Sequence, residues 1–598
     1  MTSSPSLSRV RSPWLRWFRF EGWLPALLIY LTLGVAIWWH AWSGGPSVSV
    51  PAGSLDPGQE VWFLAWALHA LEHGDNPFFT HALYAPQGVN MLANTSILAV
   101  GLLLAPVTAL FGPIVSFNVA VTLAPVASAL AAFFAIRRYA AWGPAALVGG
   151  LCYGFGPFLA VDLRYGHLNL TLLAIPPLML LTLDELVVRR RRPPVALGAI
   201  LGVLVVVQFF VSTEMLLLTV VVGFVGLVVL ALSHPRKVAE AARSTTAGLV
   251  VGVGIATAAL AYPAWFALAG PRHVAGPVFP NLDNLSSTLA ASILAHGERP
   301  GVAFVSGGNG AYLGVPLVLL LIVAGWILRR DASLRFAVLM AAIVYVLSLG
   351  AALHVTQSDT GLPLPAAVFQ HLPLFDSIVA SRFGAFADLF AGMGLAIVLD
   401  RLHAGDFGTS ANLVRNRHGE SQSRSRNLWI GGACGLIIVA TLAPLALLPP
   451  WPYAVLHLAE PRIFSERPLA TLSQTSIVRE YPPVLVDADP LVWQAEAGIT
   501  YELSDGYAIV PGPGGHATEQ PRLDSVALVF AAGVLGTLKV PVAASTDEAI
   551  RRAVAQERLK ALVVTLGETG SAGIAAVLRS AFGPPTRRSG GALVWLLS

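Results

Sequence analysis

Apolar runs of about 20 residues recur along the first three quarters of this chain, separated by short polar or basic segments. A helix needs a run of this length to cross the hydrocarbon core of a membrane. The runs do not alternate polar and apolar residues, which excludes the strands of a membrane barrel. The pattern predicts a polytopic α-helical membrane protein with about eleven transmembrane helices, at 23–42, 114–136, 144–161, 170–188, 195–211, 215–232, 250–269, 312–328, 336–353, 383–399 and 428–448.

Basic clusters between these runs predict the direction in which each helix crosses. The polar segment 1–22 carries four arginines and is expected to be a cytoplasmic tail. The run 23–42 is too long for a signal-peptide core and has no small-residue cleavage site after it, so we expect a retained first span. With this orientation each later arginine cluster between spans, including the polar loop 401–427, falls on the cytoplasmic face.

The first outer loop, 43–113, is long and contains one further apolar run at 97–110. This run has about 14 residues and carries Pro106, which favours an interfacial helix over a full crossing. A full crossing would place every later arginine cluster on the wrong face. We therefore predict a multi-pass protein of a bacterial plasma membrane, with the N-terminus in the cytoplasm.

The segment 450–598 has a different pattern, because it mixes short apolar runs with amphipathic stretches. Residues 484–486, 561–565 and 592–597 are predicted to be strands, and 547–559 a helix with a charged face. These elements predict a small extracytoplasmic α/β domain after the membrane domain, which spans 23–449.

Composition supports the prediction of a membrane protein and excludes several classes of function. Hydrophobic residues make up 55% of the chain and charged residues 12%, about half of the roughly 25% that soluble domains carry. A soluble enzyme and a disordered protein are thereby excluded. The net charge of +4 does not indicate nucleic acid, because the basic residues act as topology signals. Both cysteines, Cys152 and Cys434, lie in apolar runs, so a disulfide framework is not expected.

Polar residues gather in the predicted outer segments, beginning with the first loop. Asp56 stands at the predicted membrane surface just before an amphipathic stretch, with Glu60 four residues later. Asp75 and Asn90 follow in the same loop. An Asp followed by Pro is also typical of a helix N-cap, so a capping role for Asp56 remains the alternative.

Further polar side chains mark the outer ends of later spans. Asp162, Arg164 and His167 follow the third span, where a surface ion pair between Asp162 and Arg164 is the alternative to ligand binding. Glu214 lies between two apolar runs, and a carboxylate there is costly unless it faces a wet cavity. Arg382 precedes an inward span at headgroup level, where it could bind the phosphate of a lipid substrate or of ordinary phospholipid.

This arrangement resembles the GT-C superfamily of membrane glycosyltransferases, which includes mannosyltransferases and actinobacterial arabinofuranosyltransferases. The shared features are a first span, a large outer loop that opens with an acidic residue, interfacial helices, further spans and a C-terminal outer domain. The phrases at 56–59, 111–113, 312–314 and 381–383 are also similar to the YfhO-like branch. The likeness covers about residues 20–450.

The resemblance implies that a sugar is transferred from a polyprenyl-phosphate donor to a glycan or glycoprotein acceptor outside the membrane. It implies Asp56 as the general base, with Glu60, or alternatively Asp75, as a second acid nearby. A single base suggests inversion at the sugar carbon. The candidates for binding the donor phosphate are Arg382, Arg164, His167 and Arg272. The candidates for binding acceptor or sugar are Glu214, Asp75, Asn90 and Asp162.

The acidic metal-binding pairs of the oligosaccharyltransferase branch are not evident, so we expect no required cofactor, with a divalent metal as the less favoured alternative. Two other functions stay open. One is a non-catalytic subunit for cell-envelope assembly; the other is a flippase for lipid-linked sugars, which predicts internal repeats and ionisable residues at mid-membrane. Abundant arginine and alanine beside three lysines favour a GC-rich, actinobacterial source.

Overall fold

A computed structural model describes the chain from residue 22 onward, with several gaps. The residues it does not describe are 1–21, 52–53, 277–311, 356–358, 406–419, 444–450, 458–472, 474, 520–523, 590 and 598. Residues 1–21 of the predicted cytoplasmic tail and residues 406–419 of the predicted loop 401–427 therefore lie outside the described residues, and the placement of both segments stays a prediction.

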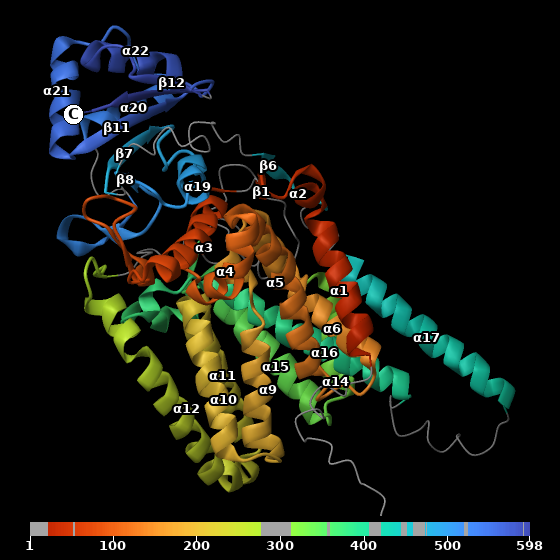
Figure 1. The fold of residues 1–598 in the computed structure, drawn as a ribbon. Helices are drawn as coiled ribbons and strands as arrows, with labels where there is room; N and C mark the ends of the chain where they lie inside the picture. Colours follow the sequence, from red (N-terminus) through yellow and green to blue (C-terminus); the bar gives the residue numbers. More distant parts are fainter. Residues whose placement is uncertain are drawn as a thin grey trace, which may run out of the picture.

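Helices form most of the described structure (Figure 1). In the membrane part they are α1 (Trp23–Ile37), α5 (Pro113–Ile136), α6 (Gly143–Gly154), α7 (Pro157–Tyr165), α8 (Leu168–Thr171), α9 (Ile175–Leu183), η3 (Asp184–Arg189), α10 (Pro194–Val211), α11 (Thr213–Ser233), α12 (Pro235–Ala269), α14 (Val315–Ile327), α15 (Ala332–Ser348), α16 (Gly384–Ala404) and α17 (Glu420–Leu442). Short 3₁₀ turns precede α16, namely η5 (Pro365–His371), η6 (Phe375–Ser377) and η7 (Ala380–Phe383), and β4 (Ala352–His354) pairs with β5 (Asp359–Pro363).

Each of the eleven predicted spans has a helical counterpart, but the helices differ in length. Among the described residues, six are long and apolar enough to cross a membrane, or seven if α6 and α7, which meet at 43°, form one span. The chain is thus mostly helical with membrane-spanning segments, as predicted, whereas the count of eleven stays a prediction. Helix α12 begins at Pro235, well before the predicted start at 250, because proline is tolerated in the first turn of a helix.

Helix α16 lies at the centre of the helical bundle. Its apolar window is 100% buried, whereas that of α11 is 22% buried and that of α12 17%. Small residues allow the neighbouring helices to approach closely. A Cβ on Gly392 of α16 would lie 2.7 Å from the carbonyl oxygen of Gly149 in α6. A Cβ on Gly198 of α10 would lie 2.1 Å from the carbonyl oxygen of Gly248 in α12.

The long first loop lies across one end of this bundle. Its elements are α2 (Trp39–Gly44), β1 (Ser49–Pro51), α3 (Asp56–His73), β2 (Phe79–Thr80), β3 (Val89–Asn90), η2 (Met91–Asn94) and α4 (Leu98–Phe111). Helix α4 has 14 residues and contains Pro106, so its length agrees with the predicted short helix; its placement at the membrane interface stays a prediction. Helices α3 and α4 lie between the bundle and the C-terminal elements (Figure 1).

The C-terminal residues form a five-stranded sheet with strand order β12-β13-β11-β7-β8. Strand β7 pairs in parallel with β8 and β11, whereas β13 is antiparallel to β11 and to β12. The strands are β7 (Ile477–Tyr481), β8 (Glu502–Leu503), β11 (Leu559–Thr565), β12 (Arg587–Ser589) and β13 (Ala592–Leu596). The remaining elements are β6 (Val455–His457), α19 (Asp489–Glu496), β9 (Val510–Pro511), η10 (Pro513–Gly515), β10 (Ala517–Thr518), α20 (Ser525–Val534), α21 (Ala544–Gln556) and α22 (Ser571–Phe582).

Strands occur near the predicted positions 561–565 and 592–597, and α21 overlaps the predicted helix at 547–559. The predicted strand at 484–486 is wrong, since these residues form a turn. Two prolines, Pro482 and Pro483, precede that turn, and proline cannot donate a backbone hydrogen bond to a sheet. The boundary of a separate domain at residue 450 stays a prediction.

The C-terminal elements pack directly on the first loop. Strand β1 pairs with β6 in antiparallel orientation. The Trp62 indole of α3 donates a hydrogen bond of 2.6 Å to the Gln494 side chain of α19. The Gln494 amide in turn donates to the carbonyl oxygen of Ala82 at 2.9 Å. These contacts fix α19 against α3, so segments more than 400 residues apart in sequence share one interface.

This interface is tight at Gly58, where an added Cβ would lie 2.4 Å from the Ala488 Cβ. We therefore expect Gly58→Ala to lower the free energy of unfolding by about 1–3 kcal/mol, the usual cost of overpacking. The measurement is thermal unfolding of the purified protein in detergent.

Gly254→Ala in α12 is the matched control, because no atom lies within 4 Å of its added Cβ. Alanine is a better helix former than glycine, so the control should be neutral or stabilised by up to about 1 kcal/mol. Equal melting temperatures for the two variants would contradict the close packing of α3 on α19.

Candidate active site

Asp56 stands at the first position of α3, beside the helix N-terminus. Leu55 is the N-cap residue, Pro57 lies in the first turn, and no side chain caps this helix end. The capping alternative for Asp56 is therefore wrong. A carboxylate in the first turn is still favoured by the positive end of the helix dipole. This leaves both carboxylate oxygens of Asp56 available to other partners.

Three side chains from separate segments bind the Asp56 carboxylate. The His167 Nε2 atom lies 3.0 Å from Oδ2, and the Ser54 hydroxyl donates to the same oxygen at 2.7 Å. The Tyr507 hydroxyl donates to Oδ1 at 3.2 Å. Tyr507 comes from the segment between β8 and β9, so the C-terminal part of the chain supplies one wall of this site.

His167 lies between two carboxylates. Its Nδ1 atom is 2.8 Å from Asp162 Oδ1, opposite the bond from Nε2 to Asp56. The loop reaches α3 because α7 ends at Gly166, whose φ of +75° favours glycine. A Cβ on Gly166 would also lie 2.7 Å from Pro57 Cγ. The glycine thus allows the close approach that places His167 against Asp56.

This arrangement keeps His167 cationic and Asp56 anionic at neutral pH. Burial alone would lower the pKa of His167, but the hydrogen bonds and charges of Asp162 and Asp56 raise it to about 10. Burial alone would raise the pKa of Asp56, but the hydrogen bond and charge of His167 outweigh it. With the hydrogen bonds from Ser54 and Tyr507, they lower the pKa of Asp56 below its ordinary value.

Glu60 lies one helical turn after Asp56, on the same side of α3. Its residue is 4% exposed, and its Oε2 atom has no hydrogen-bond partner among the described residues. Burial, followed by repulsion from Asp56, raises the pKa of Glu60 to about 8. Most Glu60 side chains are therefore protonated at pH 7, which distinguishes this acid from the ionised Asp56.

An ion pair between Arg382 and Glu214 lies near this group. The Arg382 guanidinium contacts one oxygen of Glu214, and the backbone N–H of Val379 donates to the other at 2.9 Å. Arg382 is also close enough to Asp162 and Asp56 to interact electrostatically with both. Glu214 lies between two apolar helices, where an unpaired carboxylate is unfavourable, and the Arg382 guanidinium compensates its negative charge.

Arg164 stands at the end of α7, three residues before His167. Its guanidinium carbon lies 5.8 Å from the centre of the Tyr165 ring. It also interacts electrostatically with Tyr453, whose hydroxyl donates to the carbonyl oxygen of Ala160. Arg164 therefore belongs to the same end of α7 as Asp162, whose carboxylate binds His167.

The remaining predicted site residues lie elsewhere. Asp75 follows the far end of α3, roughly 25 Å along the helix from Asp56, and its carboxylate is 3.6 Å from His69. The Asn90 amide donates to the carbonyl oxygens of Phe266 and Pro271, so it links the first loop to the end of α12. Arg272 follows Pro271, and its Nε atom has no partner among the described residues.

The site does not fit a metal ion. Both ring nitrogens of His167 face carboxylates and are protonated, so neither has a lone pair for a metal. Asp56 and Asp162 already share the positive charge of that ring. In the part of the chain that the structure describes, no three His, Cys, Asp or Glu side chains are arranged to hold a metal ion.

The same geometry bears on the predicted phosphate-binding role of His167, which stays a prediction. A phosphate ligand needs a free N–H, whereas both N–H groups of His167 are directed at carboxylates in this structure. Sequence reasoning missed Ser54 and Tyr507, together with Gln59, whose side chain contacts the Tyr507 carbonyl oxygen. Ser54 stands two residues before Asp56, whereas Tyr507 carries no sequence signal that links it to the first loop.

Comparison with known proteins identifies the fold. No family model matches the chain, and no curated protein matches its sequence. The apo oligosaccharyltransferase of Archaeoglobus fulgidus is similar in structure, with a TM-score of 0.51 and 12% identity over 92% of this chain and 70% of that chain. The oligosaccharyltransferase AglB of Archaeoglobus fulgidus, in complex with an inhibitory peptide and a dolichol-phosphate, gives a TM-score of 0.49 at 12% identity, with the same coverage.

ArnT from Cupriavidus metallidurans, in the apo state, gives a TM-score of 0.44 at 13% identity over 96% of each chain. The likeness to the apo oligosaccharyltransferase shows that this chain shares the fold of that enzyme. The predicted helical membrane fold agrees with this likeness, whereas the GT-C superfamily and its YfhO-like and actinobacterial branches stay predictions.

The charge of His167 predicts how stability depends on pH. Its pKa in the folded protein, about 10, exceeds the ordinary value of 6.5. Its stabilising contribution is therefore complete below pH 6.5 and is lost as the pH rises through 10. We expect the free energy of unfolding to fall by roughly 2–4 kcal/mol across this range, and His167→Gln to flatten the fall. Thermal unfolding in detergent at each pH measures it.

Glu60→Gln separates the contribution of Glu60 to the pH dependence of stability from that of His167. The pKa of Glu60 is about 8, above its ordinary value of 4.5, so its ionisation lowers stability as the pH rises from 4.5 to 8. Glu60→Gln should remove the loss between pH 4.5 and 6.5, reduce the loss between pH 6.5 and 8, where His167 also contributes, and keep the loss between pH 8 and 10. An unchanged pH profile in His167→Gln would contradict the imidazolium between two carboxylates.

Proposed function

We propose that this protein is a GT-C glycosyltransferase that moves a sugar from a polyprenyl-phosphate donor to an extracytoplasmic acceptor. The observation that carries the proposal is the group of Asp56, His167, Asp162 and Arg382. The group combines the ionised carboxylate of Asp56 with the guanidinium of Arg382, which pairs with Glu214. Both lie at the end of a bundle of apolar helices. Transfer from a lipid-linked donor requires both kinds of charge at one place near the membrane surface.

Asp56 is the general base in this proposal. The acceptor hydroxyl attacks the anomeric carbon, the bond from that carbon to the phosphate oxygen breaks, and the hydroxyl proton passes to Asp56. A carboxylate with a lowered pKa stays ionised at neutral pH, and it accepts the proton late, when the attacking hydroxyl has become acidic. Its negative charge also stabilises the oxocarbenium-like transition state. A single base on one face of the sugar leads to inversion.

Arg382 is the favoured cation for the departing phosphate. A guanidinium has enough N–H donors to keep its contact with Glu214 and still bind phosphate oxygens. Arg382 interacts electrostatically with Asp56 and Asp162, so its positive charge lies in the same site as the base. This charge stabilises the negative charge that develops on the departing phosphate. Arg164 is the second candidate, and His167 is a positioning residue that orients Asp56.

The fold supports this class of reaction. The oligosaccharyltransferase with which this chain shares a fold is by its name a glycosyltransferase. Helices α10, α11 and α12 are mostly unburied within the protein, so lipid chains can lie against them. A bacterial plasma membrane, a cytoplasmic N-terminus and an extracytoplasmic site are parts of the same proposal. The C-terminal elements would then lie outside the membrane, where the segment between β8 and β9 covers the site through Tyr507.

Asp56→Asn tests the base directly. We expect the variant to fold and insert but to lower the rate of sugar transfer by about 10²–10⁴-fold, the usual contribution of a general base. The assay measures the release of polyprenyl phosphate from a panel of polyprenyl-phosphate sugars, with cell-envelope glycan as acceptor and the protein in detergent.

Glu72→Gln is the control, because this exposed carboxylate lies on the same helix near its other end. It should leave turnover unchanged. Full activity of Asp56→Asn would remove the residue from its role as base. Acceptor binding without any donor consumption by the wild-type protein would favour the assembly-subunit alternative, and movement of intact donor across vesicles would favour the flippase.

Arg382→Gln tests the phosphate contact. We expect KM for the donor to rise by roughly tenfold or more, because a charge-assisted contact is lost. Arg382→Lys should recover part of this loss, since it keeps the charge but not the planar fork. Initial rates at increasing donor concentration provide the measurement. An unchanged KM in Arg382→Gln would show that the phosphate binds elsewhere.

A further inference from the structure

A second feature of the membrane part is a large pocket between α9, α11, α14, α15 and α16. Its volume is about 890 Å³, near the upper end of the range for small-molecule sites. On α11 the pocket extends from Thr219 to Ser233, whereas Glu214, which binds Arg382, begins the same helix. The pocket therefore opens toward the end of the bundle that lies away from Asp56.

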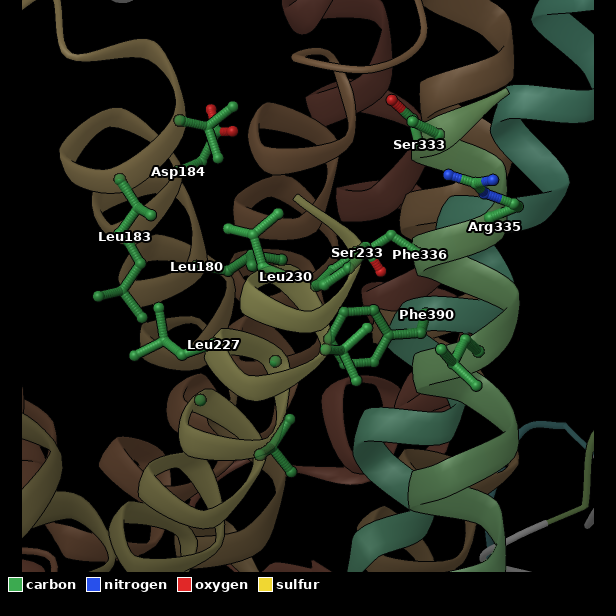
Figure 2. Close-up of a pocket in the computed structure, with 18 of the residues that line it drawn as sticks. Leu180, Leu183, Asp184, Leu227, Leu230, Ser233, Ser333, Arg335, Phe336 and Phe390 are labelled. Atoms are coloured by element: carbon green, nitrogen blue, oxygen red, sulfur yellow. The ribbon is translucent and has the colours of Figure 1, made fainter. Parts of the chain in front are cut away.

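The walls of this pocket are apolar. Its lining includes Leu180 and Leu183 of α9, Leu227 and Leu230 of α11, Phe336 of α15 and Phe390 of α16. In Figure 2 the polar side chains of Asp184, Ser333 and Arg335 lie at one end, whereas Leu227 and Phe390 lie farther inside. The pocket thus combines an apolar interior with a polar entrance.

Glycines leave additional room along these walls. Gly223 and Gly226 of α11 and Gly325 of α14 line the pocket. A Cβ added at these positions would meet its nearest neighbour at 3.9, 3.6 and 3.7 Å, which is ordinary contact. Close helix packing therefore does not require glycine here, in contrast to Gly392 of α16. The missing side chains enlarge the pocket instead.

Basic side chains from separate helices surround the entrance. Arg190 follows η3, Lys237 lies on α12 and Arg335 on α15. Neither Lys237 nor Arg335 forms an ion pair with a described residue, and both are exposed. The acids at the entrance are largely neutralised.

Arg189 binds the carboxylate of Asp184 at 2.6 Å, and the Tyr139 hydroxyl donates to it at 2.8 Å. Glu240, the other acid at the entrance, faces Arg190 at 3.8 Å. Two acids thus have cationic partners, whereas Lys237 and Arg335 leave a surplus of positive charge at the mouth of the pocket.

We propose that this pocket binds an anionic phospholipid of the leaflet opposite the Asp56 site. Its acyl chains lie along α11 and α15, and its phosphate lies between Lys237 and Arg335. Apolar walls of this size suit hydrocarbon chains, and the surplus cations are complementary to a negatively charged headgroup. The basic residues of the entrance lie where α12 and α15 begin and where η3 ends. This lipid is distinct from the sugar donor, so the inference does not depend on the proposed reaction.

The test uses the full-length protein, purified in detergent and stripped of lipid. Phosphatidylglycerol and phosphatidylcholine with identical acyl chains are added separately, and native mass spectrometry counts bound lipids. We expect wild-type protein to bind phosphatidylglycerol at least tenfold more tightly. Lys237→Gln with Arg335→Gln should reduce this preference at least fivefold.

Arg236→Gln with Arg330→Gln is the matched control. These two exposed arginines do not line the pocket, and their removal changes the net charge by the same amount. An equal loss of preference in this control, or no preference in the wild-type protein, would overturn the proposal.

Filling the pocket gives an independent test. Gly226→Leu should lower the binding of both lipids, because the new side chain occupies the space of the acyl chains. If this variant does not fold, phosphatidylglycerol with a photoreactive acyl chain is used on the wild-type protein. Crosslinks to peptides of α9, α11, α14, α15 or α16, the helices that form the pocket, would support the proposal, and crosslinks confined to helices outside the pocket would overturn it.

Discussion

The pairing of opposite charges at the end of an apolar helical bundle is the interaction on which the candidate site depends. A lone ionised side chain in such surroundings is strongly disfavoured, whereas a hydrogen-bonded pair is tolerated. His167 compensates the charges of two carboxylates at once, Asp56 and Asp162. Arg382 compensates the charge of Glu214. Loss of one partner leaves the others buried and uncompensated, so the members of the group are mutually dependent.

Helix α3 couples this group to the rest of the molecule. Its first residue, Asp56, belongs to the charged group, and its next turns contact the C-terminal elements through Gly58 and Trp62. Close backbone approach is needed on both sides of this helix, since Gly166 lies against Pro57 and Gly58 against Ala488. Packing of small residues and pairing of charges thus act together to fix the carboxylate.

The fold could be predicted from the sequence where one local rule dominates. Long apolar runs locate the helices, because a membrane span requires about 20 apolar residues. Asp56, Asp162 and His167 stand out as polar residues beside apolar runs. The capping role of Asp56 and the strand at 484–486 were wrong because a tertiary contact and two prolines, respectively, outweigh the local pattern.

Long-range partners could not be predicted in the same way. Nothing in the sequence around Glu214 indicates that Arg382, 168 positions later, binds it. Tyr507 is likewise an ordinary aromatic residue until the C-terminal elements pack on α3. Asp75 and Asn90 lie in the same loop as Asp56, yet they contact other parts of the chain, because proximity in a loop does not determine proximity in space.

The position of Tyr507 has a consequence for biogenesis. During synthesis, the tyrosine partner of Asp56 emerges about 450 residues after Asp56 itself. Until then the carboxylate environment is incomplete and open on the side that α19 and the tyrosine will cover. A chain terminated before the segment between β8 and β9 therefore lacks the Tyr507 contact, and its candidate site stays incomplete.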